Sequence, residues 1–97
     1  MRKLGNNWKI LYHPTVVKKD IPNLSTLEAK RVRSVIETKL STSPVLYGVP
    51  LRGSLRQLWK LRVGDWRVVF SIDGHEVKIL VIANRKNVYK LASRRVY

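Results

Sequence analysis

A run of basic residues inside a strand-like segment is the first candidate for chemistry. Residues 58–89 read LWKLRVGDWRVVFSIDGHEVKILVIANRKNVY, and they place Lys60, Arg62 and Arg67 among alternating apolar residues. An arginine side chain can hold a phosphate or carboxylate group through two parallel hydrogen bonds, and a lysine adds a compact positive charge. These residue types therefore predict an anion-binding site, provided that the fold brings them together.

The dipeptide Gly64-Asp65 predicts how two of these cations meet. A two-residue hairpin turn at this point pairs Val63 with Trp66 and places Arg62 directly opposite Arg67. Like charges that face each other across a sheet are destabilising unless an anion lies between them. The pairing therefore favours a negatively charged ligand. An ordinary solvated sheet face with basic residues is the alternative interpretation.

A second turn at Asp73-Gly74 is expected to pair Ile72 with His75 and Phe70 with Val77. The third strand then ends beside the first turn, where Arg85 and Tyr89 follow. Alternation assigns the apolar face to Trp59, Leu61, Val63, Trp66, Val68, Phe70, Val77, Ile79 and Val81. The second face is expected to carry Leu58, Lys60, Arg62, Arg67, Val69, Ser71, Glu76, Lys78 and Leu80.

Other residue types offer less chemistry. Both histidines, His13 and His75, are expected at strand or turn positions away from the cations, and no metal-ligand spacing is present. We therefore expect no metal and no cofactor. Trp59 and Trp66 belong to the apolar face, which leaves Tyr47 and Tyr89 as the better-placed aromatic residues.

The elements before the sheet complete an expected α+β fold. Residues 8–13 predict a first strand, and residues 15–20 predict a helical turn. Ser25-Thr26-Leu27-Glu28 is a capping box that begins a helix ending near residue 40. Residues 84–97 predict a loop and a short C-terminal helix or tail. We expect one domain over residues 1–97, with a small antiparallel sheet in the order β-α-α-β-β-β and the N-terminal helices packed on one face.

The charge balance indicates the kind of partner. Twenty Lys and Arg residues against six Asp and Glu residues give a net charge of +14 over 97 residues. Such a surface attracts polyanions, of which nucleic acid comes first, an anionic membrane second and an acidic protein third. No apolar run reaches the roughly 18–20 residues that cross a bilayer. Residues 1–10 lack the apolar core of a secretory signal, so we expect a soluble cytoplasmic protein without membrane attachment.

The segments PLRGSLRQLWKLRVGDWRVVFSI and VKILVIANRKNVY resemble the RelE/ParE toxin superfamily of toxin–antitoxin systems. The resemblance covers roughly residues 46–90 in its motifs. It implies a small α+β fold and a cognate antitoxin that wraps around the toxin. It also implies one of two activities, which are cleavage of mRNA in the ribosomal A site or inhibition of DNA gyrase.

The resemblance carries over to individual residues. Lys60, Arg67, Arg85 and Tyr89 match positions that RelE-like nucleases use in catalysis, and Arg62 is expected to assist. We also expect RNA binding by Arg62, Lys86, Arg52 and Lys78. The family position that holds a second lysine in some members is Leu58 here. Retention of the four matching residues favours the nuclease branch.

The implied reaction is metal-independent RNA cleavage by the 2′-OH of the substrate. Arg67 and Arg85 would hold the phosphate, while Lys60 or Tyr89 could act as base and Arg85 or Tyr89 could serve the leaving group. Further cations would dock on ribosomal RNA, and these are Lys18, Lys19, Arg31, Arg33, Arg94 and Arg95. The acidic antitoxin is the expected protein partner. The alternatives are a ParE-like gyrase inhibitor without nuclease activity, and a catalytically weak homologue that binds RNA or the ribosome.

Overall fold

The structure is a computed structural model that describes residues 8–96. The expectation that residues 1–10 are not a secretory signal falls mostly on residues 1–7, which lie outside the described residues. Within residues 8–96, no helix combines the length and apolar character that a membrane crossing requires.

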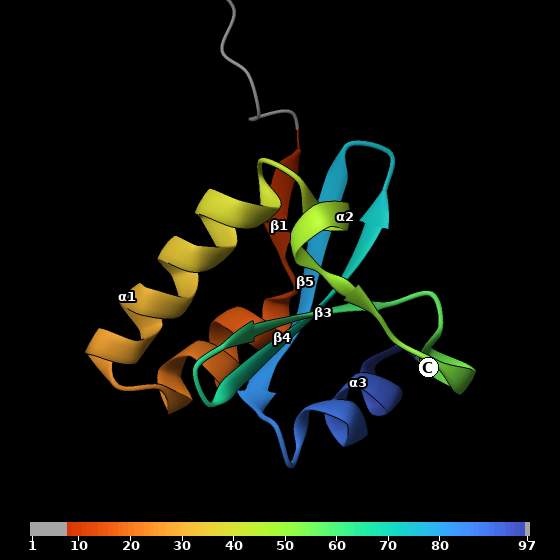
Figure 1. Cartoon of the computed structure of the whole chain (residues 1–97). Helices are drawn as coiled ribbons and strands as arrows, with labels where there is room; N and C mark the ends of the chain where they lie inside the picture. Colours follow the sequence, from red (N-terminus) through yellow and green to blue (C-terminus); the bar gives the residue numbers. More distant parts are fainter. Residues whose placement is uncertain (1–7, 97) are drawn as a thin grey trace, which may run out of the picture.

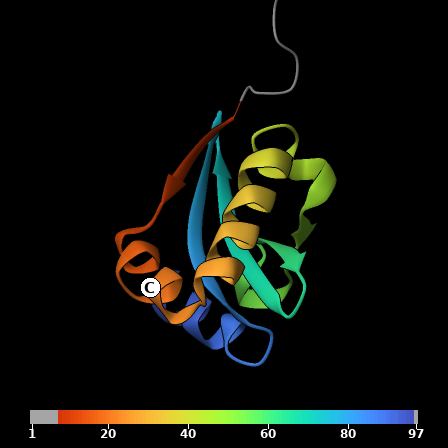
Figure 2. The ribbon, with the colours of Figure 1, turned by 90° about the vertical axis from the view of Figure 1, so that its left-hand side faces the viewer.

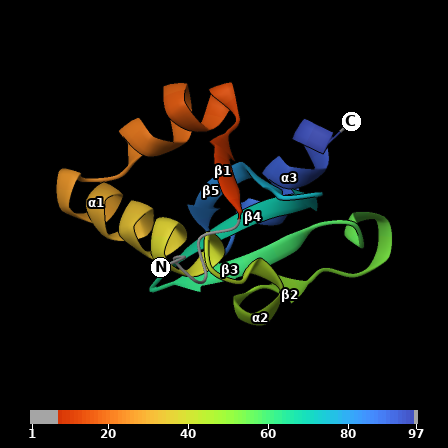
Figure 3. The same cartoon turned by 90° about the horizontal axis from the view of Figure 1, so that it is seen from above.

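A five-stranded sheet organises the fold, in the strand order β1-β5-β4-β3-β2. Figure 3 shows β1 and β2 at its two edges. The strands are β1 (Lys9–Tyr12), β2 (Val49–Pro50), β3 (Trp59–Val63), β4 (Trp66–Asp73) and β5 (Glu76–Asn84). The expected α+β class is confirmed. One detail differs, because β1 pairs with β5 in parallel, whereas the other strand pairs are antiparallel. No hairpin turn sets the direction of β1, since helices separate it from the rest of the sheet.

Helical segments cover both faces of this sheet (Figure 1). Helical turns at Val16–Asp20 and Ile21–Asn23 lead into α1 (Thr26–Val35), which continues as a wider helical turn over Ile36–Leu40. Figure 2 shows α1 crossing one face. The short helix α2 (Pro44–Tyr47) precedes β2, a single turn at Gly53–Leu55 precedes β3, and α3 (Val88–Val96) covers part of the other face.

The predicted capping box begins α1. The backbone N–H of Glu28 donates to Ser25 Oγ over 3.1 Å, and the backbone N–H of Ser25 donates to Glu28 Oε1 over 3.2 Å. Glu28 Oε2 also accepts a hydrogen bond from Trp66 Nε1 over 3.1 Å. The start of α1 is therefore fastened to the first residue of β4.

The first hairpin has the predicted register, with Val63 opposite Trp66 and Arg62 opposite Arg67. The second hairpin turns one residue later than predicted. Asp73 still belongs to β4 and pairs with Glu76, because Gly74 occupies the turn with a φ of +60°, a conformation that glycine adopts readily.

The pairing of β4 with β5 contains a bulge. Phe70 pairs with Ile79 but Val69 pairs with Val81, so Leu80 is an extra residue in β5. One extra residue reverses the alternation beyond it. Val81 therefore lies on the second face, opposite Val69, and its predicted place on the first face is wrong.

The two faces have separate apolar cores. The first core packs the sheet against α1 and contains Val16, Leu24, Val32, Ile36, Leu40, Leu61, Val63, Val68, Phe70, Val77, Ile79 and Ile82. The second core packs the other face against α3 and contains Leu58, Val69, Val81, Ala83, Val88 and Ala92. The second face is thus divided between an apolar part beneath α3 and a basic part along β3 and the start of β4.

Candidate active site on the second sheet face

Lys60 and Tyr89 come together beside the second core. Lys60 Nζ donates a hydrogen bond to the Tyr89 hydroxyl over 3.3 Å and lies 5.8 Å from the centre of the tyrosine ring. Lys60 projects from β3, and Tyr89 follows the buried residue Val88 in the first turn of α3. Burial of Val88 therefore fixes the part of α3 that presents Tyr89, whose side chain remains accessible to a ligand.

Arg62 and Arg67 form the second part of the site. They face each other across β3 and β4, as the sequence predicts. Arg67 Nη1 donates to the backbone carbonyls of Gly64 over 2.9 Å and Trp66 over 3.0 Å. These contacts hold the half-buried guanidinium group at the hairpin turn. Because both use Nη1, the Nη2 and Nε donors stay available for an anion.

Two cavities meet along this face. A cavity of about 710 Å³ is lined by Val49, Pro50, Leu51, Arg52, Leu55, Lys60 and Tyr89. A second, of about 410 Å³, is lined by Lys39, Tyr47, Val49, Lys60, Leu61, Arg62 and Arg67. Both include Lys60 and Val49, and neither lining contains a carboxylate. The surface offers an anionic ligand several cations and no opposing acidic group.

The other predicted residues differ in their positions. Arg85 and Lys86 are exposed in the loop after β5, whose last residue, Asn84, pairs with Trp66. They therefore lie at the same end of the sheet as the first hairpin turn, while Arg52 lines the larger cavity. Lys78 pairs with Ser71 toward the other end, and its Nζ lies 3.7 Å from Asp73 Oδ2. The structure thus brings Lys60, Arg62, Arg67, Tyr89 and Arg52 to the cavities and places Lys78 away from them.

Arg95 is not the exposed cation that we expected to meet ribosomal RNA. Its side chain is 12% exposed, and its guanidinium group pairs with Asp20, which is 6% exposed. The amino-acid pattern predicts a helical turn ending at Asp20, but it contains no signal for a partner so distant along the chain. Lys39 was also missed as a cavity residue, because its position beside Tyr47 depends on how the end of the first helix packs.

The histidines have structural contacts elsewhere. His13 Nδ1 accepts a hydrogen bond from the backbone N–H of Thr15 over 3.1 Å, and the His75 ring packs edge-on against Trp8 at 6.3 Å between centroids. Within residues 8–96, no group of three His, Cys, Asp or Glu side chains is arranged to hold a metal ion.

Comparison with known proteins identifies the family. No family model matches the chain. The toxin RelE of Mycobacterium tuberculosis strain H37Rv is 34% identical over 85 residues, which cover 82% of this chain and 88% of that protein. The chain belongs to the RelE family of toxins. The resemblance of the two sequence motifs to the superfamily is thereby confirmed.

Solved structures of RelE proteins share the fold. The RelBE2 toxin–antitoxin complex of M. tuberculosis matches with a TM-score of 0.76 and 26% identity, over 87% of this chain and 95% of that chain. A mutant of Escherichia coli RelE in the free state matches with a TM-score of 0.72 and 14% identity, over 93% and 95%. RelE in the RelB–RelE complex of Methanococcus jannaschii matches with a TM-score of 0.63 and 23% identity, over 82% and 95%. The five-stranded sheet with its C-terminal helix is thus the RelE fold.

Proposed function

We propose that this RelE-family toxin cleaves mRNA in the A site of the ribosome and so inhibits translation. The contact between Lys60 and Tyr89 is the observation that carries the proposal. It places two groups capable of proton transfer beside the opposed pair Arg62 and Arg67, in cavities lined by cations and without carboxylates. A site of this composition suits an RNA phosphodiester.

In the proposed reaction the ribose 2′-oxygen attacks the adjacent phosphorus atom, and the bond from phosphorus to the 5′-oxygen breaks. The 2′-hydroxyl loses a proton, the 5′-oxygen gains one, and the products carry a 2′,3′-cyclic phosphate and a 5′-hydroxyl. No metal takes part. The reaction requires a 2′-hydroxyl, which restricts the substrate to RNA.

The side chains take distinct roles. Arg67 holds the phosphate through its free guanidinium donors and stabilises the charge that develops on the non-bridging oxygens. Arg62 adds positive charge across the strand pair. Lys60 and Tyr89 are in contact, so a proton taken from the 2′-hydroxyl by one can pass to the other. Arg85, in the loop beside the hairpin, adds a further phosphate contact.

In this proposal the ribosome orients the mRNA for the reaction. Orienting the reacting groups can lower a barrier by several kcal/mol (roughly 7–11 kcal/mol in the best-aligned intramolecular reactions). A ribosome that holds the mRNA in line would allow modestly tuned side chains to suffice. The remaining surface cations Lys18, Lys19, Arg31, Arg33 and Arg94 would contact ribosomal RNA.

We further propose an antitoxin partner with an acidic segment. Two related structures are toxin–antitoxin complexes, RelBE2 of M. tuberculosis and RelB–RelE of M. jannaschii, which supports a similar partner here. A net charge of +14 favours a negatively charged polypeptide that folds as it binds.

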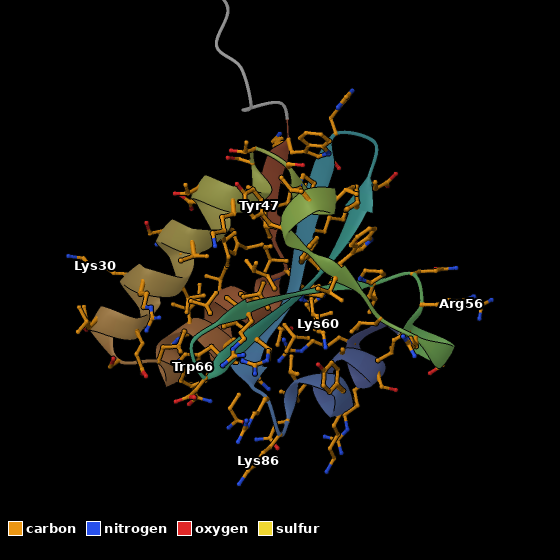
Figure 4. All side chains as sticks on the ribbon, in the orientation of Figure 1. Lys30, Tyr47, Arg56, Lys60, Trp66 and Lys86 are labelled. Carbon is orange, nitrogen blue, oxygen red and sulfur yellow. The ribbon has the colours of Figure 1, made fainter. Side chains whose placement is uncertain are left out.

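The test is a reconstituted translation reaction on a defined mRNA, with primer extension to locate cuts. The wild-type protein should cut in the A site and leave free mRNA intact. Arg67→Ala should lower the single-turnover rate by about 100-fold or more, the usual cost of removing one transition-state donor. Lys30→Ala removes the same charge from an exposed position on α1 and should cut at the wild-type rate; Figure 4 shows Lys30 far from Lys60.

Absence of cuts by folded wild-type protein would overturn the nuclease proposal. Inhibition of supercoiling by DNA gyrase under the same conditions would then support the ParE-like alternative. If Arg67→Ala cuts mRNA as fast as Lys30→Ala, the proposed role of Arg67 and of the second sheet face in cleavage is wrong.

A further inference from the structure

Tyr47 is an exposed aromatic residue next to the candidate active site. Its side chain lines the cavity that also contains Lys60, Arg62 and Arg67, and 41% of its surface is exposed. Lys39 Nζ lies 5.4 Å from the centre of its ring. Figure 4 shows Tyr47 at α2 on one side of Lys60, with Lys86 on the other.

Core packing does not account for this ring. Tyr47 belongs to neither apolar core, although its helix is firmly seated. Pro44 is fully buried at the start of α2, and the backbone N–H of Gly48 donates to the carbonyl of Pro44 over 2.9 Å. A Cβ at Gly48 would lie 2.6 Å from the Phe70 ring, so α2 packs directly against the sheet. The structure thus holds an exposed tyrosine on a rigid support.

Each of the two cavities contains a lysine whose ammonium group lies over a tyrosine ring. In the larger cavity, Lys60 lies over Tyr89 at 5.8 Å, and in the smaller cavity Lys39 lies over Tyr47 at 5.4 Å. Each cavity therefore offers an aromatic ring on which the flat face of a base can stack and an ammonium group for a phosphate. An aromatic ring combined with neighbouring cations is how proteins bind single-stranded nucleic acid.

We propose that Tyr47 is the stacking platform for one nucleobase of the bound RNA, adjacent to the scissile phosphate. Lys39 binds the phosphate of the same nucleotide, and Val49, which is 52% exposed, contacts the edge of the base. The lining contains four cations, Lys39, Lys60, Arg62 and Arg67, and no carboxylate, which suits a polyanion. The exposed ring among these cations favours RNA as that polyanion, because a base can stack on it. This assignment rests on the proposed RNA cleavage, and it gives the site a second nucleotide position.

The experiment measures single-turnover cleavage on ribosomes programmed with a defined mRNA. Tyr47→Ala is compared with Tyr47→Phe, which keeps the ring, and with Leu46→Ala, which shortens an exposed side chain on the same helix that lines neither cavity. Saturating and sub-saturating toxin concentrations separate the half-saturating concentration from the maximal rate. Each variant is also tested on mRNAs with an abasic residue on the 5′ or the 3′ side of the scissile phosphate.

Tyr47→Ala should lower the apparent second-order rate at least about 5-fold, which corresponds to the loss of one base–ring stack, while Tyr47→Phe and Leu46→Ala stay within about 2-fold of wild type. One of the two abasic mRNAs should show the same loss with wild-type protein. On that mRNA, Tyr47→Ala should cause no additional loss, because the variant and the abasic residue remove the same contact.

Four results would overturn the proposal. Equal rates for Tyr47→Ala and Leu46→Ala, while the wild type still cuts, would reject the subsite and leave the nuclease function intact. If Tyr47→Ala lowers the cleavage rate by the same factor on both abasic mRNAs as on the intact mRNA, the subsite is also rejected and the nuclease function stays intact. Weaker binding of the antitoxin by Tyr47→Ala, with unchanged cleavage, would assign this surface to the protein partner. Absence of cleavage by the folded wild type would instead reject the proposed function and the subsite together.

Discussion

Asp20 and Arg95, 75 residues apart in the chain, form a buried ion pair that fastens α3 to the sheet. Arg95 Nη1 lies 2.6 Å from Asp20 Oδ2, and Nη2 lies 2.8 Å from Oδ1. Asp20 Oδ2 also accepts the backbone N–H of Ile82, and Arg95 Nη1 donates to the carbonyl of Leu80, over 2.8 Å and 2.9 Å. The pair thus satisfies the carbonyl of the bulged residue Leu80 and the N–H of Ile82, two residues further along β5.

Asp20→Ala should lower the free energy of unfolding by about 3–5 kcal/mol, because it leaves Arg95 charged and buried without its partner. Urea unfolding monitored by tryptophan fluorescence measures the change. Asp73→Ala is the matched control, since it removes a carboxylate from the exposed pair with Lys78, where 76% of the Asp73 side chain is exposed. Its cost should stay below about 1 kcal/mol. Equal costs for the two variants would contradict the structural role of the buried pair.

Gly48→Ala should destabilise the fold by about 1–3 kcal/mol, because the added methyl group would meet the Phe70 ring at 2.6 Å and the Pro44 carbonyl oxygen at 2.8 Å. Thermal or urea unfolding measures the loss. In a Phe70→Leu background the cost of Gly48→Ala should be smaller, since the aromatic ring has gone. If Gly48→Ala costs the same free energy of unfolding in both backgrounds, the Phe70 ring does not limit the space at Gly48.

The capping box gives the fold a dependence on pH. Hydrogen bonding from the Ser25 backbone N–H, and then from Trp66, holds the pKa of Glu28 below its ordinary value of 4.5. A carboxyl whose pKa falls on folding adds stability that is fully present above the unfolded pKa. That stability is lost as the pH falls through the lower, folded pKa.

Glu28→Gln should therefore be less stable than the wild type at neutral pH, and the difference should shrink as the pH is lowered below 4.5. Urea unfolding at a series of pH values between neutral and about 3 measures it. A difference that stays constant over this range would show that the charge of Glu28 plays no part in capping α1 or in holding Trp66.

Arg62→Thr should separate stability from activity. Removal of one of two like charges that face each other across β3 and β4 should raise the free energy of unfolding by up to about 1 kcal/mol, and added salt should reduce the gain. The same change should slow cleavage on the ribosome. Lys78→Thr, which pairs with Ser71, is the control and should not stabilise the protein. A lower free energy of unfolding for Arg62→Thr would mean that repulsion between Arg62 and Arg67 does not destabilise the sheet.

The residues that set the local geometry were readable from the sequence. Gly64-Asp65 fixed the first hairpin and thus the opposition of Arg62 and Arg67, because a two-residue turn allows one register. Ser25 and Glu28 marked the start of α1 for a similarly local reason. These features depend on a few neighbouring residues, so their patterns survive without tertiary context.

The features that were missed depend on distant parts of the chain. The bulge at Leu80 follows a hairpin that turns at Gly74. Arg95 bonds the carbonyl of Leu80, and Asp20 accepts the N–H of Ile82. The parallel direction of β1 and the position of Lys39 beside Tyr47 likewise result from packing between elements. A pattern along one segment carries no information about such partners.

The single extra residue in β5 also explains why this strand reads as an almost unbroken apolar run. Val77 and Ile79 enter the first core. Beyond the extra residue, Val81 and Ala83 enter the second core, while Ile82 between them enters the first. Because Leu80 and Val81 both lie on the second face, deletion of Leu80 would restore strict alternation and leave Val81, Ile82 and Ala83 on the faces that they occupy now. The extra residue is therefore a spacer, and its loss would shorten β5 but keep its phase.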